Sequence, residues 1–184
     1  MSDSTIRQRL ARWAVLPAAI GLGLGLSAFS APAAEAATHY CNGYKATIVG
    51  TNGADDIEGT SGRDVIVGLG GNDDIDGNGG DDIICAGSGH DEVDGGSGND
   101  YINGGSGHDE LEGGNDRIYG SSGNDHIEGE SGKDKLYGQS GHDLVEGGSG
   151  KDTVSGGSGK DTVKQGSASE REEDRWEDRY GYDD

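Results

Sequence analysis

The sequence predicts an all-β fold in which short repeats stack into a parallel solenoid, and three observations lead to that class. Residues 50–164 repeat with a period of nine, 38 of the 184 residues are Gly, and only 30 % are hydrophobic. Such a composition cannot build a conventional globular core of large packed side chains. A tandem repeat of one short unit gains its stability by stacking on its neighbours instead.

The first 36 residues have the three parts of a secretory signal peptide. Three arginines precede an apolar stretch over residues 13–29, and Ala34-Glu35-Ala36 supplies the small residues of a cleavage site. The alternative is an uncleaved membrane anchor, but a stretch of 17 residues with an internal Pro is at the lower limit for a span. We therefore expect a secreted, extracellular protein in a compartment where disulfides form.

Four segments follow from the change in pattern along the chain. They are the signal peptide (1–36), an N-terminal cap segment (37–49), the repeat region (50–166) and an acidic C-terminal tail (167–184). The repeat region holds thirteen units from Gly50 to Lys164, and the unit at 113–119 has seven residues instead of nine.

Three positions of the unit are nearly constant. Position 4 is Gly in twelve units, and position 8 is Ile, Leu or Val in all thirteen. Position 6 is Asp in every unit: Asp55, Asp64, Asp73, Asp82, Asp91, Asp100, Asp109, Asp116, Asp125, Asp134, Asp143, Asp152 and Asp161. Thirteen matches in phase cannot arise from composition alone.

The spacing of these positions predicts a geometry. Side chains alternate along an extended segment, so at positions 7–9 the aliphatic residue points inward and its neighbours point outward. Positions 1–6 must turn the chain sharply, which Gly permits. Two units then form one coil of 18 residues, and successive coils build two parallel sheets.

Stacking of the coils sets each Asp over the Asp two units away. Two carboxylates and the carbonyl oxygens of tight turns form an all-oxygen cage that suits calcium. Without the ion these carboxylates repel one another, so we expect folding to depend on calcium. The formal net charge of −21 also argues against nucleic acid and anionic membranes as partners.

The motif G-G-x-G-x-D-x-(aliphatic)-x, as in Gly95 to Asn103, resembles the hemolysin-type (RTX) calcium-binding nonapeptide. That resemblance covers residues 50–164. It implies a calcium-loaded parallel β-roll in which the thirteen Asp and the turn carbonyls are the ligands. Many members of the family carry a toxin, protease or lipase domain, but this chain has a different N-terminus and no segment for one, so we expect no such activity.

The shortened unit bears on the number of ions. It lacks two turn positions, and we expect Asp116 not to complete a normal site; the alternative is a neutral deletion in a tolerant loop. Thirteen units give eleven same-side pairs, two of which include this unit. We therefore expect about nine calcium ions under an 18-residue coil.

The outward positions differ between the two predicted sheets. Odd-numbered units carry an acidic ladder: Asp56, Glu58, Asp74, Asp76, Glu92, Asp94, Glu110 and Glu112. If residues 41–49 are counted as a degenerate first half-coil, the even-numbered units begin with an apolar stripe: Thr47, Val49, Val65, Val67, Ile83, Cys85 and Tyr101. Either a partner or the chain's own N-terminal segment must cover that stripe.

Cys41 and Cys85 are the only cysteines, and they can pair in one arrangement. If residues 38–45 stayed in coil register, Cys41 would lie too far from Cys85 for a disulfide. If the segment folds across the apolar stripe, the pair can close.

These patterns favour a secreted, non-enzymatic calcium-binding repeat protein with a structural or interaction role outside the cell. The alternative is an adhesin or ice-binding solenoid, although a regular outward file of Thr and Asn is missing. His90 and His108 share one turn position a coil apart, which suggests either zinc or simply exposed turn residues. No Ser-His-Asp set stands out, and the physiological partner is not indicated.

Overall fold

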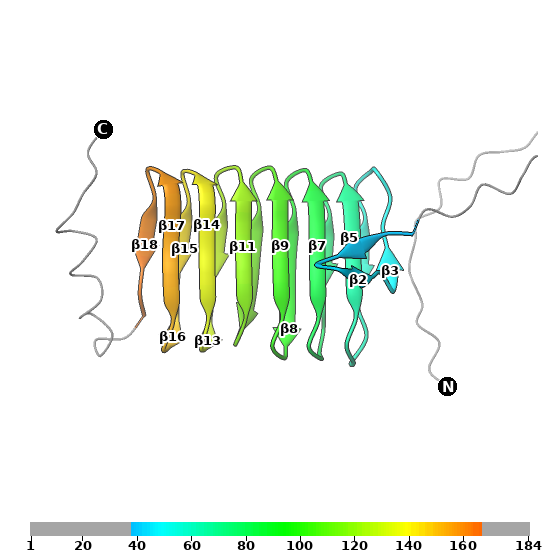
Figure 1. The fold of residues 1–184 in the computed structure, drawn as a ribbon, viewed down its shortest axis with the longest axis horizontal. Helices are drawn as coiled ribbons and strands as arrows, with labels where there is room; N and C mark the ends of the chain where they lie inside the picture. Colours follow the sequence, from blue (N-terminus) through cyan, green and yellow to red (C-terminus); the bar gives the residue numbers. More distant parts are fainter. Residues whose placement is uncertain (1–37, 167–184) are drawn as a thin grey trace, which may run out of the picture.

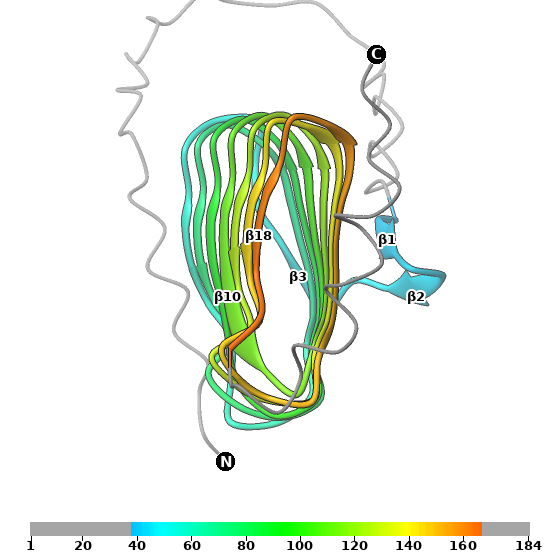
Figure 2. The ribbon, with the colours of Figure 1, turned by 90° about the vertical axis from the view of Figure 1, so that its left-hand side faces the viewer.

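The computed structural model describes residues 38–166 as a flattened solenoid of stacked coils (Figure 1). No helix among these residues is long and apolar enough to cross a membrane. The predicted signal peptide and acidic tail lie outside the described residues. Viewed along its axis, the solenoid has two sheets that face each other across a narrow interior (Figure 2). The predicted all-β parallel β-roll is confirmed.

Each main sheet has seven parallel strands, and we name the two after the repeat units that build them. The odd sheet contains β4 (Asp56–Glu58), β6 (Asp74–Asp76), β8 (Glu92–Ser97), β10 (Glu110–Gly114), β12 (His126–Glu128), β15 (Leu144–Glu146) and β18 (Thr162–Lys164). The even sheet contains β3 (Ile48–Val49), β5 (Val65–Gly70), β7 (Ile83–Ser88), β9 (Tyr101–Ser106), β11 (Arg117–Ser122), β14 (Lys135–Gly141) and β17 (Thr153–Gly159). Two short strands, β13 (Ser131–Gly132) and β16 (Ser149–Gly150), pair at one edge.

The register repeats every 18 residues, as two units per coil require. Ile57 lies beside Ile75 in the odd sheet, and Ile66 lies beside Ile84 in the even sheet. Across the shortened unit the offset falls to 16, where Leu111 pairs with Ile127. The aliphatic file therefore stays continuous through the deletion.

The core consists of the position-8 side chains of both sheets. Together with Ala86 they form one buried cluster, and Ile48 and Val163 close it at the two ends. The buried members are Ile57, Ile66, Ile75, Ile84, Val93, Ile102, Leu111, Ile118, Ile127, Leu136, Val145 and Val154. Burying these side chains in one file between the sheets supplies the hydrophobic part of the stability.

The prediction that strands occupy positions 7–9 alone is wrong for β8 and β10 of the odd sheet and for most of the even sheet. There β5 continues through Leu69 and Gly70, which pair with Gly87 and Ser88 of β7. The backbones at positions 1–3 come close enough to continue the ladder, because most of the residues there are Gly or other small residues. The sharp bend is confined to the rest of the turn.

A small antiparallel hairpin lies across the outer surface of the even sheet, over β5 and β7 (Figure 1). It consists of β1 (Tyr40–Cys41) and β2 (Tyr44–Lys45), joined by Asn42 and Gly43, which both have positive φ. Such a two-residue turn matches the twist of a hairpin. The apolar stripe is thus covered by the chain's own N-terminal segment.

The inward residue of this hairpin is Cys41, which is 1 % exposed and packs on Val65, Val67 and Ile83. It forms a disulfide with Cys85, with the two Cα atoms 5.8 Å apart. Tyr40 and Tyr44 point outward and remain half exposed or more. The cover over the stripe is therefore small, and one covalent bond fixes it in place.

Candidate metal sites

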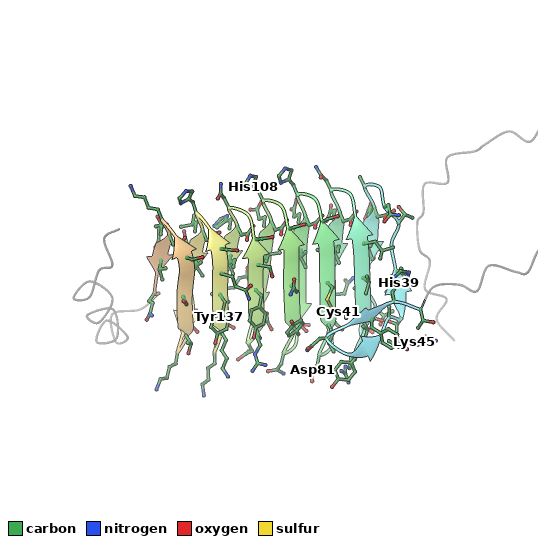
Figure 3. All side chains as sticks on the ribbon, turned by 45° about the horizontal axis from the view of Figure 1, so that its top comes forward. His39, Cys41, Lys45, Asp81, His108 and Tyr137 are labelled. Carbon is green, nitrogen blue, oxygen red and sulfur yellow. A yellow bond between two sulfur atoms is a disulfide. The ribbon has the colours of Figure 1, made fainter. Side chains whose placement is uncertain are left out.

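The thirteen position-6 Asp residues form two rows, one along each edge of the solenoid. Figure 3 shows two position-5 neighbours of these rows, His108 and Asp81, on opposite edges. Eleven of the Asp side chains, from Asp64 to Asp152, are buried. Asp55 and Asp161, in the first and last units, are partly exposed. The structure therefore brings together residues that lie 16 or 18 apart in sequence.

Each row is tied together by hydrogen bonds that run from coil to coil. The backbone N–H of Asp82, for example, donates to Oδ1 of Asp100 over 2.7 Å. All eleven same-side pairs make this contact, at 2.7–3.1 Å. One oxygen of nearly every carboxylate is thus committed to the backbone of the preceding coil.

The second carboxylate oxygen is left without a donor in most of the described turns. Oδ2 is buried and has no hydrogen-bond partner in Asp73, Asp82, Asp91, Asp100, Asp109, Asp116, Asp125, Asp134, Asp143 and Asp152. A buried oxygen anion without a partner is costly, and a set of ten calls for a common explanation. A cation held in each turn would satisfy all of them.

The backbone around these oxygens leaves space that only Gly permits. A Cβ placed on Gly77 would lie 2.9 Å from Oδ2 of Asp82 and 2.6 Å from the carbonyl oxygen of Gly95. At position 4, Gly107 has a φ of 145°, and a Cβ there would collide with the carbonyl of Gly89. Each turn is therefore lined by carboxylate and carbonyl oxygens, the donor set of a hard cation such as calcium.

Side chains alone do not complete such a site. Among residues 38–166, no group of three His, Cys, Asp or Glu side chains is placed to hold a metal ion. A site in these turns must therefore draw on backbone carbonyls, as the sequence led us to expect. The residues present fit calcium on that condition.

The electrostatics of the rows also favour bound positive charge. Burial raises the pKa of Asp73, Asp100 and Asp109 to about 6 and that of Asp116 to about 7. Neighbouring carboxylates raise these pKa values further, whereas the backbone N–H donors lower them. Burial likewise raises the pKa of Asp82, Asp91, Asp125, Asp134 and Asp143. Each row therefore holds carboxylates whose negative charge is poorly stabilised by the protein alone.

Asp116 takes a regular place in its row, which differs from the geometry expected of the shortened unit. It accepts from the N–H of Asp100 at 2.8 Å and donates its own N–H to Asp134 at 2.7 Å. The ladder slips by one residue between Glu112 and Gly114, where Gly114 pairs with Ser97, so one of the two missing residues is lost from the paired strand. The backbone contacts of the carboxylate are preserved.

Asp55 and Asp64 differ from the rest because their Oδ2 atoms do have partners. Oδ2 of Asp64 accepts from both the N–H and the hydroxyl of Thr60, at 2.7 and 2.8 Å. Asp55 accepts in the same way from Thr51. No signal at position 6 could have revealed this, since the difference lies in the residue at position 2.

The histidines form part of a second ladder at position 5. The backbone N–H of His108 donates to Nδ1 of His90, and the N–H of Asn124 donates to Nδ1 of His108. Since Nδ1 accepts in each case, a neutral ring carries its proton on Nε2 and has no free lone pair for a metal. The contacts therefore favour a structural role for these turn residues over zinc binding.

The two outer faces differ in chemistry as the sequence indicated. The outer face of the odd sheet presents carboxylates. The ring of His126 lies between two of them and contacts both Glu110 and Glu128. On the even sheet, beyond the hairpin, the ring of Tyr119 stacks on that of Tyr137 at 5.1 Å between centroids and lies 5.5 Å from that of Tyr101.

Comparison with known families agrees with this arrangement. The family model for the RTX calcium-binding nonapeptide repeat matches the chain in four copies, at residues 49–84, 76–111, 111–145 and 131–163. These matches include the shortened unit. No curated protein matches the chain.

Proposed function

The chain belongs to the family of proteins built from RTX calcium-binding nonapeptide repeats, and we propose that it acts outside the cell as a secreted, non-enzymatic calcium-binding β-roll. The observation that carries the proposal is the set of ten buried Oδ2 atoms without a hydrogen-bond donor. The position-6 carboxylates and the turn carbonyls are the ligands we propose. Bound calcium would supply the positive charge that the two Asp rows lack, at about nine sites.

Secretion is supported by two independent features. The first 36 residues have the pattern of a signal peptide, and the described part of the chain contains the Cys41–Cys85 disulfide. Disulfides persist mainly in oxidising compartments, outside the reducing cytosol. We propose the same four segments as the sequence indicates, with cleavage after Ala36.

A structural or interaction role is supported by how the chain uses its ionisable groups. The buried carboxylates bind the backbone of the neighbouring coil, and the histidine Nδ1 atoms of the position-5 ladder do the same. Side chains used in this way stabilise the stack instead of activating a substrate. The alternative is an adhesin or ice-binding solenoid, and a thermal-hysteresis measurement on the calcium-loaded protein separates ice binding from the other roles.

Far-UV circular dichroism of the chain tests the proposal. In chelator we expect a largely unfolded spectrum, because the ten buried carboxylates whose Oδ2 lacks a partner repel one another. In millimolar calcium we expect cooperative formation of β structure, since each site joins neighbouring coils. Magnesium should not replace calcium, because it demands a tighter octahedron and dehydrates reluctantly. Equal folding in magnesium, or unchanged β content in chelator, would contradict the proposal.

A further inference from the structure

We propose that Asp55 and Asp64 are not calcium ligands, and that Thr51 and Thr60 close the first two turns in place of ions. The inference rests on the proposed function, because it assigns which of the thirteen turns take calcium. It makes the first coil an ion-free end on which the calcium-dependent coils stack.

The contacts of Asp64 leave its carboxylate satisfied by the protein. Oδ2 receives two donors from Thr60, at 2.7 and 2.8 Å. Oδ1 lies 3.3 Å from the hydroxyl of Thr47, which is also 3.2 Å from the carbonyl oxygen of Val65. Asp55 receives the N–H and the hydroxyl of Thr51 on one oxygen, at 2.6 and 2.9 Å. A carboxylate that already accepts several hydrogen bonds in its charged form has less need of a cation.

The backbone of these two turns also differs from that of the later ones. Position 2 has positive φ in the later full-length turns, for example 81° at Leu69 and 75° at Gln139, whereas neither threonine does. β-branched residues strongly disfavour that conformation. Threonine at position 2 therefore keeps the turn in a shape that directs its own N–H and hydroxyl at the Asp.

Ser121 provides an internal comparison, because it places a hydroxyl at position 2 of a later turn. Its φ is 81°, and its hydroxyl donates to Asn103 instead of to the Asp of its own turn. Oδ2 of Asp125 in that turn remains buried without a partner. A hydroxyl at position 2 is therefore not sufficient, and the backbone conformation that Thr imposes is also required.

This assignment predicts where the ion-binding pairs lie. Of the eleven stacked Asp pairs, one includes Asp55 and one includes Asp64, which leaves nine. The nine include both pairs made by Asp116. The two ion-free turns therefore lie at the N-terminal end, beside the disulfide, and not at the shortened unit.

Native mass spectrometry of the full chain in calcium tests the assignment by counting bound ions. At saturating calcium we expect nine ions for the wild type, and the same number for the double variant Asp55→Asn/Asp64→Asn. The matched control, Asp125→Asn/Asp134→Asn, removes carboxylates that each belong to two stacked pairs and should lose up to four ions.

Eleven ions in the wild type, or a loss of two in the N-terminal double variant, would overturn the assignment. No bound calcium in the wild type would instead refute the proposed function. A second variant tests the threonine directly, since Thr60→Val removes the hydroxyl but keeps the shape. At a fixed calcium concentration it should lower the folding equilibrium constant about two- to tenfold, the equivalent of one hydrogen bond. Thr60→Ser should restore the wild-type constant, and an unchanged constant in Thr60→Val would contradict the closure.

Discussion

The inside of the turns and the outside of the sheets follow different rules in this molecule. Asp100 is buried and makes the same contacts as its equivalents throughout the row, whereas the next residue, Tyr101, occupies a position that is acidic, aliphatic or basic in other units. The interior must repeat because each coil binds the next through it. The exterior is free to vary, so one solenoid carries an acidic face and an aromatic face.

The largest effect should follow from changes in the Asp rows. Asp100→Ala and Asp116→Ala each remove a carboxylate from two stacked pairs. Both should destabilise the calcium-loaded fold by about 3–5 kcal/mol and so raise the calcium midpoint, because bound calcium loses a charged ligand. Titration by circular dichroism measures this. Glu92→Ala, on the exposed acidic face, should leave the midpoint unchanged. A clearly smaller effect at Asp116 would mean that the shortened turn holds its ion poorly.

The disulfide tests the cover over Val65, Val67 and Ile83, which occupy outward positions and are nevertheless buried. Reduction, or Cys85→Ser, should release the hairpin from Val65, Val67 and Ile83 and raise the calcium needed for folding. Closing a loop with a sequence separation of 44 stabilises by at most about 4 kcal/mol in the chain-entropy model. Increased binding of a hydrophobic dye should accompany the change. Identical midpoints with and without reductant would show that the cover contributes nothing.

A pair of glycines tests how strictly the interior must repeat. Gly107→Ala adds a Cβ at a φ of 145° and against the carbonyl of Gly89, and should cost about 1–3 kcal/mol or more. Gly62→Ala is the matched control at the same position of the unit, because a Cβ there has no atom within 4 Å. Calcium midpoints of the two variants give the comparison, and equal values would contradict it.

The pH dependence of the calcium-free chain should be the most gradual effect. The pKa values of the Asp rows are raised in the folded state, to about 6 for Asp73 and about 7 for Asp116. The folded state therefore binds more protons than the unfolded chain, so its stability is highest in acid and falls as the pH rises through these pKa values.

Circular dichroism in calcium-free buffer should accordingly show more β structure at about pH 5 than at about pH 8. In the presence of calcium the trend should reverse, since protons compete for the same carboxylates. A calcium-free spectrum that does not change across this range would show that the rows are not what opposes folding.

The sequence was enough to predict the coil register, the aliphatic core and the stacking of Asp, because these depend on positions that recur in every unit. It did not predict the continuation of β5 through Leu69, because backbone pairing at positions 1–3 leaves no side-chain pattern. It placed Asp116 in its row but not the hydrogen bonds that hold it there, since a deletion shows which residues are absent but not which part of the turn loses them. The closure by Thr60 depends on a local φ, which a repeat consensus hides.

Consecutive units alternate between the two sheets. Whether a unit is odd or even in number, its parity, therefore decides which face its outward residues occupy. Inserting or losing one whole unit would keep the core and the Asp spacing within every later coil, yet it would move every later outward residue to the opposite face. An insertion just before Glu92, for instance, would place its carboxylate on the side that now carries Tyr101. Only the gain or loss of two units keeps every outward residue on its own face. The length of such a protein can therefore change in steps of one coil without exchanging the chemistry of its two faces. The two-residue deletion at 113–119 leaves this parity intact, since the shortened unit still counts as one.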